Sequence, residues 1–508
     1  MTRRLWIVLA TLIVAAAALA APVSANPNNN NSEKLRSAVT LDGVRQHQQA
    51  LQAIADISGG NRFAGLVGHD RSGDYVADQL RAAGYEVAFN YFDYFSFFER
   101  SPSQFAQTAP TPTTYTEAVD YRVMSFSGTG DVTAPVRPLV GLGCTASDFA
   151  GFPAGSIALV SRGVCSFRIK TTNAAAAGAP AILIYNSATG VGVLNGTLGD
   201  GGLATIPALG LTRSLGISLA ATPGLRVRVR TDTGAETLPT RNVIAELPGR
   251  NDDNVVVVGA HLDSVNAGPG INDNGSGSAA ILETAIQMAK VKPRNTVRFA
   301  WWSAEESGLI GSTRYVNALP QAELDRIALN LNFDMVGSPN FVRFVYDGDD
   351  SAFPVGPGAA AGPPGSGAIE AQFHSYFASQ GLPSAETPFS GRSDYGPFIA
   401  KGIPAGGLFT GAEGVKTAAQ AATYGGTAGV AYDSCYHAAC DAFPNFSATA
   451  LAQMSDAVAH SVITYGQNTE AVNAVRGKGN FKPAGSAGPD GTTSGEGGGL
   501  HADHEVDS

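Results

Sequence analysis

The second half of the chain alternates compact apolar runs with stretches that carry apolar residues at helical spacing. The apolar runs have the length of strands that are buried on both faces, and they cover 254–260, 296–301, 327–333 and 403–409. The helical patterns cover 276–289, 369–379 and 448–465. Strands that alternate with helices pair in parallel through crossover connections. This half therefore predicts a mostly parallel, twisted α/β sheet flanked by helices.

Two further helical patterns lie near the amino terminus. They cover 41–57 and 72–83, and Gly84 follows the second as a stop signal. A strand is predicted over 85–91. We expect residues 34–118 to pack with the sheet as the first part of a split domain.

The middle of the chain follows a different pattern. Residues 119–237 carry many glycines and two short β-branched runs, at 156–161 and 181–185, with an alanine-rich helical pattern at 171–177 between them. This composition predicts a small β-rich module inserted into the larger domain, which then continues over 238–475.

The amino terminus has the features of a secretory signal peptide. Arg3 and Arg4 precede an apolar run over 5–21, and small residues follow at 23–25, where a signal peptidase cuts. We expect residues 1–25 to be removed and the protein to be secreted. The rival interpretation is a retained membrane anchor, since the run is nearly long enough to span a bilayer.

Two segments have the composition of disordered chain. Residues 26–33 are rich in asparagine and proline and are predicted to be a linker, and residues 476–508 form a tail rich in glycine and serine. The remainder is typical of folded soluble protein, with 44% hydrophobic and 15% charged residues among 508.

The formal net charge of −10 argues against a general nucleic-acid binder, because that role needs a basic face. We expect no nucleic-acid partner, no stable membrane association after signal cleavage, and a monomer.

Export affects the interpretation of the four cysteines, because thiols outside the cytoplasm tend to form disulfides. Two disulfides are expected. Cys144 with Cys165 and Cys435 with Cys440 are the natural local pairs, although four cysteines permit three connectivities.

Residues typical of metal ligands follow three of the predicted strands, at the edge of the sheet where ligands of α/β folds gather. Each acid alone has an ordinary explanation as a helix cap or a solvated surface group. Several carboxylates on one rim repel one another, however, and a pair of divalent ions would neutralise them. Histidine and carboxylate ligands without thiolate fit a catalytic zinc site. The residues concerned are His261, Asp263, Asp273, Glu305, Glu306 and Asp334.

A second histidine ligand is predicted at His437, which lies between Cys435 and Cys440. A closed disulfide would restrain this loop and reduce the entropy lost in fixing a ligand. The alternative, a Cys-His-Cys zinc knuckle, suits an oxidising compartment less well. Other histidines, including His374, lie in helical or surface patterns with no partner pattern, and we assign them no role.

Four motifs together resemble the co-catalytic zinc aminopeptidases of metallopeptidase family 28. They are GAHLDS at 259–264, GINDNGSG at 270–277, SAEESGL at 303–309 and NFDMVGS at 332–338. Tyr436-His437 between two cysteines is similar to the secreted bacterial leucine-type members. The likeness extends from about residue 34 to residue 470 and implies the zinc-dependent exopeptidase fold.

The resemblance implies two Zn²⁺ ions per chain and a role for each residue. One ion would bind His261 and Asp334, the other Glu306 and His437, with Asp273 bridging both. Glu305 would be the unligated general base, Asp263 would orient the His261 imidazole, and Tyr436 would donate to the developing oxyanion. Arg392 resembles a family residue at the substrate end, and it either binds the substrate backbone or pairs with Asp394.

The inserted module has a likeness of its own. GSIALVSRGVCSF at 155–167, followed by Lys170 and by GAPAILIYN at 178–186, resembles a protease-associated domain. The resemblance implies a lid or substrate guide, or simple packing with no direct role.

The expected function is therefore a secreted metallo-aminopeptidase that cleaves the N-terminal bond of peptides and proteins, with a preference for apolar N-terminal residues. One alternative is a carboxypeptidase or dipeptidase of related fold, which would bind a substrate carboxylate through clustered arginines. The other is a metal-free binding protein on the same fold.

Overall fold

The computed structural model describes residues 25–187, 192–199, 201–356 and 358–473. The segment predicted to be a signal peptide, apart from Ala25, and the predicted glycine-rich tail lie outside these residues. Within them, no helix is both long enough and apolar enough to cross a membrane.

The larger lobe is built on a sheet whose central strands are parallel. Strands β10 (Asn295–Trp302), β9 (Asn251–His261), β11 (Ile327–Phe333) and β14 (Ala405–Phe409) lie side by side in this order, and each adjacent pair is parallel. The four predicted apolar runs form these strands, and the predicted α/β class is confirmed.

The edges of the sheet depart from the parallel pattern. On one side β8 (Arg226–Leu247) pairs with β10 antiparallel. On the other side β12 (Phe344–Tyr346) is antiparallel to β14, and β13 (Ala385–Thr387) is parallel to β12 at the edge of this path through the sheet.

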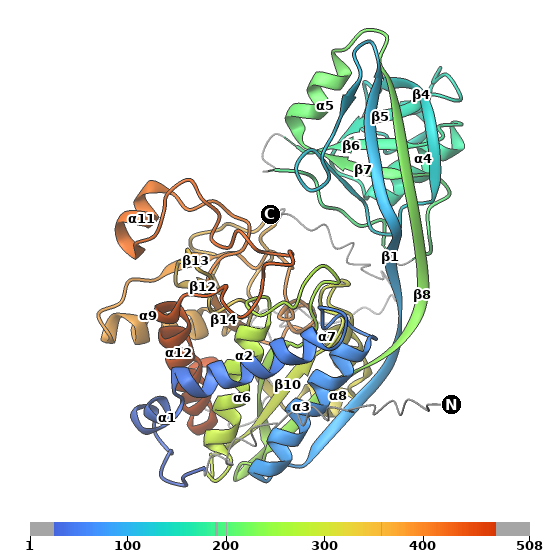
Figure 1. The fold of residues 1–508 in the computed structure, drawn as a ribbon. Coiled ribbons are helices and arrows are strands. Elements are labelled where there is room, and N and C mark those ends of the chain that lie inside the picture. The colour runs from blue at the N-terminus through green and yellow to red at the C-terminus, as the bar shows by residue number, and fades with distance from the viewer. Residues whose placement is uncertain (1–24, 188–191, 200, 357, 474–508) are drawn as a thin grey trace, which may run out of the picture.

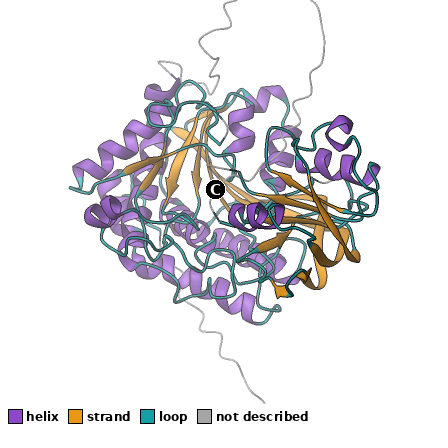
Figure 2. Ribbon diagram, turned by 90° about the horizontal axis from the view of Figure 1, so that it is seen from above, coloured by secondary structure: helices purple, strands orange, loops and turns teal. Residues whose placement is uncertain are grey.

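Successive side chains of a strand point to opposite faces of the sheet. Each face of this sheet therefore carries an apolar cluster, and helices cover both faces. Val256, Val258 and Ala260 of β9 belong to the main core, whereas Val255 and Val257 belong to a second cluster on the opposite face. Helices lie around the strands of this lobe when it is viewed from above (Figure 2).

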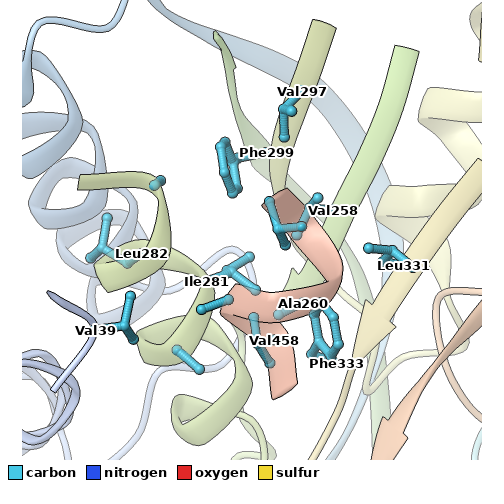
Figure 3. Packing of buried hydrophobic residues seen from close by; sticks show 14 of the residues in the cluster. Val39, Val258, Ala260, Ile281, Leu282, Val297, Phe299, Leu331, Phe333 and Val458 are labelled. Carbon is cyan, nitrogen blue, oxygen red and sulfur yellow. The ribbon is translucent and has the colours of Figure 1, made fainter. Parts of the chain in front are cut away.

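The main core is packed by α6 (Gly275–Met288), α9 (Ser366–Ser379) and α12 (Ala448–Gln467), which form where helical patterns are predicted. Figure 3 shows side chains of α6, such as Ile281, packed near Val258 of β9, Phe333 of β11 and Val458 of α12. The short helices of the lobe are α7 (Ile310–Ala318), α8 (Gln321–Leu324), α10 (Gly396–Ala400), α11 (Ala418–Tyr424) and α13 (Glu470–Asn473).

The amino-terminal helices pack onto the same core. They are α1 (Ser32–Ala38), α2 (Leu41–Asp56) and α3 (Val67–Ala83), with Gly84 in the left-handed conformation after α3. Helix α3 begins five residues before the predicted start. Its first turn contains Gly68, where a Cβ atom would lie 2.1 Å from the Asn61 carbonyl oxygen, so glycine serves close packing here.

A long two-stranded ribbon connects the two lobes. The strand predicted over 85–91 is the start of β1 (Val87–Ala109), which pairs antiparallel with β8 over nearly its whole length. Figure 1 shows the ribbon rising from the larger lobe into the smaller one.

The smaller lobe is a β-rich module with its own core. Its other strands are β2 (Thr113–Thr114), β3 (Tyr121–Val123), β4 (Gly130–Pro138), β5 (Ile157–Ser161), β6 (Ile182–Tyr185) and β7 (Ala208–Leu211), and its helices are the 3₁₀ helix Ala146–Phe149, α4 (Phe167–Ala176) and α5 (Arg213–Ala220). Two clusters of buried side chains fill it. The protein has two disulfides, Cys144–Cys165 in this lobe and Cys435–Cys440 in the larger one.

Candidate metal centre and substrate pocket

The predicted metal-binding residues converge at the carboxyl edge of the parallel strands. His261 is the last residue of β9, Glu305 and Glu306 follow β10, and Asp334 follows β11. Asp273 lies in the loop that leads into α6. Parallel strands end at one edge, so chain order and fold together bring these side chains to one place.

Asp273 lies between the two histidines. One of its oxygens, Oδ1, is 3.2 Å from His261 Nε2, and the other, Oδ2, is 3.3 Å from His437 Nε2. His261 Nε2 is also 3.4 Å from Asp334 Oδ1, and His437 Nε2 is 3.0 Å from Glu306 Oε2. The centre therefore has two halves, each with one imidazole, one carboxylate of its own and one oxygen of Asp273.

These spacings suit metal binding. Donor atoms bound to one tetrahedral zinc at roughly 2.0–2.1 Å lie about 3.4 Å from one another. Glu305 stands slightly apart, with Oε2 3.9 Å from His261 Nε2. Glu306 Oε1 and Asp334 Oδ1 are buried and accept no hydrogen bond from any described residue, so each has a lone pair available to a cation.

The electrostatics of the centre favour a cation. Burial alone would lower the pKa of His261, but Asp334 and Glu305 raise it well above its ordinary value. Burial likewise opposes protonation of His437, yet Glu306 and Asp273 raise its pKa to about 10. Burial raises the pKa of Glu305 well above its usual range, and the charge of Asp334 adds to this shift. A cluster with this excess of carboxylates attracts protons or metal ions.

The backbone beside the centre is held in an unusual conformation at three places. Ala304, directly before Glu305, has φ 56°, Met335, directly after Asp334, has φ 47°, and His437 itself has φ 55°. Residues other than glycine rarely adopt this left-handed region, and such strain is concentrated at functional sites.

Asp263 contacts both the first histidine and the loop that carries the two glutamates. Its backbone carbonyl lies 3.2 Å from His261 Nδ1, and its carboxylate oxygen lies 3.7 Å from the same nitrogen. The carboxylate also accepts the backbone N–H groups of Glu305 and Glu306 at 3.2 and 3.3 Å. The family resemblance implied that the Asp263 carboxylate orients the imidazole, but the atom within hydrogen-bond range of Nδ1 is the Asp263 carbonyl oxygen. The sequence gave no sign of the contact between the carboxylate and the two backbone N–H groups.

Asp433 and Asp441 flank the disulfide loop and were not singled out from the sequence. Asp441 follows Cys440 and accepts the backbone N–H groups of Asn272 and Asp273, at 2.8 and 2.9 Å. Asp433 accepts the side-chain amide of Asn272 at 2.7 Å. The segment that carries His437 is thereby bonded to the loop that carries Asp273.

Arg62 is a third residue that sequence analysis missed. It is fully buried, and its guanidinium donates to the carbonyls of Leu262, Pro269 and Gly270, with the last two at 2.8 and 2.6 Å. Burial lowers its pKa to about 10, while Asp263 opposes this shift, so the side chain stays charged at neutral pH. Arg62 thus fixes the loop between His261 and Asp273. Carbonyl acceptors belong to every residue, so no sequence signal could have shown this contact.

Ser393 supports Asp334 from the other side. Its hydroxyl donates to Asp334 Oδ2 at 2.6 Å and accepts from the Asn332 amide at 2.7 Å. This relay fixes one oxygen of Asp334 and leaves the other facing His261.

A pocket with a volume of about 70 Å³ opens beside the centre. Asp273, Glu305, Asp334 and His437 form its polar end, and mostly apolar side chains line the remainder, among them Met335, Tyr346, Pro388, Phe409 and Ala412.

Arg392 and Tyr436 also line this pocket. Arg392 donates to the phenolic oxygen of Tyr436 at 3.0 Å and pairs with Glu413 at 2.8 Å. Its ion pair is thus with Glu413, and no pair with Asp394 is present among the described residues. Because the phenolic oxygen accepts from Arg392, its own O–H is directed elsewhere.

The chain resembles known peptidases over most of its length. The model of peptidase family M28 matches residues 242–462, and the PA domain model matches residues 129–219. An aminopeptidase of Pseudomonas aeruginosa (strain UCBPP-PA14) is 46% identical over 479 residues, which cover 88% of each chain. The chain belongs to peptidase family M28.

Two further comparisons agree with this assignment. The M28 peptidase is 40% identical over 441 residues to a protein named probable leucine aminopeptidase 2 of Trichophyton verrucosum, with 86% of each chain covered. It matches the structure of a zinc aminopeptidase from Bacillus subtilis with a TM-score of 0.59 and 25% identity, over 87% of this chain and 98% of that one. The predicted family membership and the inserted PA domain are confirmed, and this M28 peptidase is an enzyme of the zinc aminopeptidase type.

Proposed function

We propose that the protein is a two-zinc aminopeptidase that removes single residues from the free amino ends of peptides and proteins. The observation that carries the proposal is the position of Asp273, whose two oxygens face different histidines. One zinc would bind His261, Asp334 and Asp273, and the other His437, Glu306 and Asp273. The donor set and the unpaired oxygens of Glu306 and Asp334 support this assignment.

When bound, the two ions would lower the pKa of a water molecule and polarise the scissile carbonyl. Glu305 would accept a proton from this water and deliver it to the leaving amine. Its position next to the ligands but outside the shortest contacts supports this role. The phenol of Tyr436 would donate to the oxygen of the tetrahedral intermediate, and Arg392 would hold the phenol in position.

The carboxylates of Glu305 and Asp334 would receive the free amino group of the substrate. The apolar lining of the pocket supports a preference for apolar N-terminal side chains. A carboxypeptidase would need arginines that read a substrate carboxylate, and Arg392 is the sole arginine among the described residues that line this pocket.

Comparing two adjacent substitutions tests these roles. Glu305→Gln should lower turnover of leucyl-p-nitroanilide by roughly 10²–10⁴-fold while two zinc ions per chain are retained, because only the proton carrier is changed. Glu306→Gln, its matched control, should lose zinc as well as activity. Loss of both metals in Glu305→Gln would contradict the general-base role.

A second assay tests the requirement for a free amino terminus. The parent enzyme should hydrolyse a free dipeptide or aminoacyl-anilide and leave the N-acetylated analogue intact. Cleavage of the blocked peptide alone would refute the aminopeptidase proposal, and a chain without zinc would favour a binding protein.

We further propose that the enzyme is secreted and monomeric. Two disulfides and the composition of the first 25 residues support export. In this proposal residues 34–118 and 238–475 form the catalytic domain and 119–237 the PA domain, except that the outer part of β1 and β2 pack with the smaller lobe. Strands β1 and β8 run through both lobes.

A further inference from the structure

A second group of metal-ligand side chains lies on α9 and on the edge strand β13, whose last residue, Thr387, lines the substrate pocket. Glu370 and His374 are one turn apart on α9, and Glu386 is the middle residue of the edge strand β13. One donor atom from each lies within 4.8 Å of the others. His374 Nε2 is 3.7 Å from Glu370 Oε1 and 3.9 Å from Glu386 Oε1.

These contacts are not ordinary hydrogen bonds. Both distances exceed the range of a hydrogen bond, and Nε2 of His374 is buried without a hydrogen-bond partner in the part of the chain that the structure describes. The other ring nitrogen, Nδ1, is 2.8 Å from the Ser384 hydroxyl, which fixes the orientation of the ring. A histidine held by one nitrogen, with the other directed between two carboxylates, has the arrangement of a metal ligand.

Glu370 is held in a similar way. Its Oε2 accepts the backbone N–H groups of Gly348 and Asp349, at 2.8 and 3.2 Å, and Oε1 faces His374. Only 7% of its side chain is exposed, whereas His374 and Glu386 are 29% and 32% exposed, so an ion can reach the group from solvent.

We propose that Glu370, His374 and Glu386 bind a third divalent ion, of the transition-metal type that imidazole favours, such as Zn²⁺ or Co²⁺. Three protein ligands leave a coordination position for water. The ion would join α9 to β13 at the edge of the sheet. Thr387, the last residue of β13, and Pro388 line the substrate pocket, so the ion would brace this wall.

Metal stoichiometry tests the proposal without any measurement of activity. The full-length secreted form, freed of metal by a chelator, is titrated with Co²⁺ and followed by calorimetry and by visible absorption. The parent should bind one more equivalent than His374→Gln or Glu386→Gln, and each variant should keep the remaining sites. His460→Gln, which removes a histidine with no carboxylate in ion-pair range among the described residues, should bind as the parent does.

Two further results decide the outcome. Glu306→Gln should lose cobalt at the catalytic centre and still bind the equivalent that His374→Gln removes, which separates this site from the proposed catalytic ions. Excess Co²⁺ should raise the melting temperature of the parent further than that of Glu386→Gln. Equal stoichiometry in the parent and in both folded variants would overturn the proposal.

Discussion

Arg62 offers the sharpest test of how the fold positions the metal centre. Replacement by methionine keeps a long apolar stem but removes the donors to the carbonyls of Leu262, Pro269 and Gly270. A buried acceptor left without its partner costs about 1–3 kcal/mol, so three give roughly 3–9 kcal/mol. Water entering the loop would reduce the loss, and we expect about 3–5 kcal/mol, as for the removal of one member of a buried charged pair.

The loss should extend to function, because the same loop joins His261 to Asp273. Urea unfolding gives the free energy, and the bound zinc and the rate on leucyl-p-nitroanilide report the centre. We expect Arg62→Met to lose stability, zinc and activity together. Arg62→Lys keeps the charge but presents one nitrogen in place of the forked guanidinium. Its stability, zinc content and activity should therefore lie between those of Arg62→Met and those of the parent.

A matched control exists on the surface. Arg228, whose side chain is 42% exposed, also donates three hydrogen bonds, to Asp131 and Gln104. Since exposed partners are readily replaced by water, Arg228→Met should leave unfolding, zinc and activity nearly unchanged. If Arg62→Met unfolds within about 1 kcal/mol of the parent and keeps its zinc, the positioning role assigned to Arg62 is wrong.

Two further predictions concern the disulfide loop and the pH dependence of stability. Replacing Cys435 and Cys440 by serine releases a short loop whose closure is worth about 2 kcal/mol. The zinc that the proposed function assigns to His437 should then bind roughly 30-fold more weakly in a chelator competition, and unchanged affinity would refute this. Burial lowers the pKa of His460 to about 4. The unfolded chain therefore binds more protons, so this contribution is complete above about pH 6.5 and is lost as the pH falls towards 4. His460→Gln should make urea unfolding less dependent on pH in this window, and equal slopes for variant and parent would contradict the assignment.

The sheet and the approximate place of the metal centre could be predicted because their signals are local. The strand predicted over 327–333 coincides with β11, since continuous apolar residues leave few alternatives. Asp334 follows it directly, and parallel pairing then brings this residue to the same edge as His261. The position of each residue relative to the end of its strand thus supplied most of the information from which the place of the metal centre was predicted.

The supporting contacts could not be predicted because they join distant segments through common groups. Arg62 binds backbone carbonyls about 200 residues away along the chain. Asp441 binds backbone N–H groups, which nearly every residue offers. The length of β1 was also missed, since its outer part (FDYFSFFERSPSQF, 92–105) shows no regular alternation of apolar and polar residues. It is stabilised by pairing with β8, which comes more than a hundred residues later.

The PA domain is connected to the larger lobe through the ribbon of β1 and β8, so that it could in principle be removed as a unit. Phe95 and Thr237 are cross-strand neighbours, and Tyr94 donates to Ala64 within the larger lobe. The chain thus leaves and re-enters the catalytic body at adjacent points, where a short hairpin turn could join the two strands and leave the sheet beneath intact. A gene could gain or lose such a module in one event while the sheet that carries the metal centre keeps its strand order.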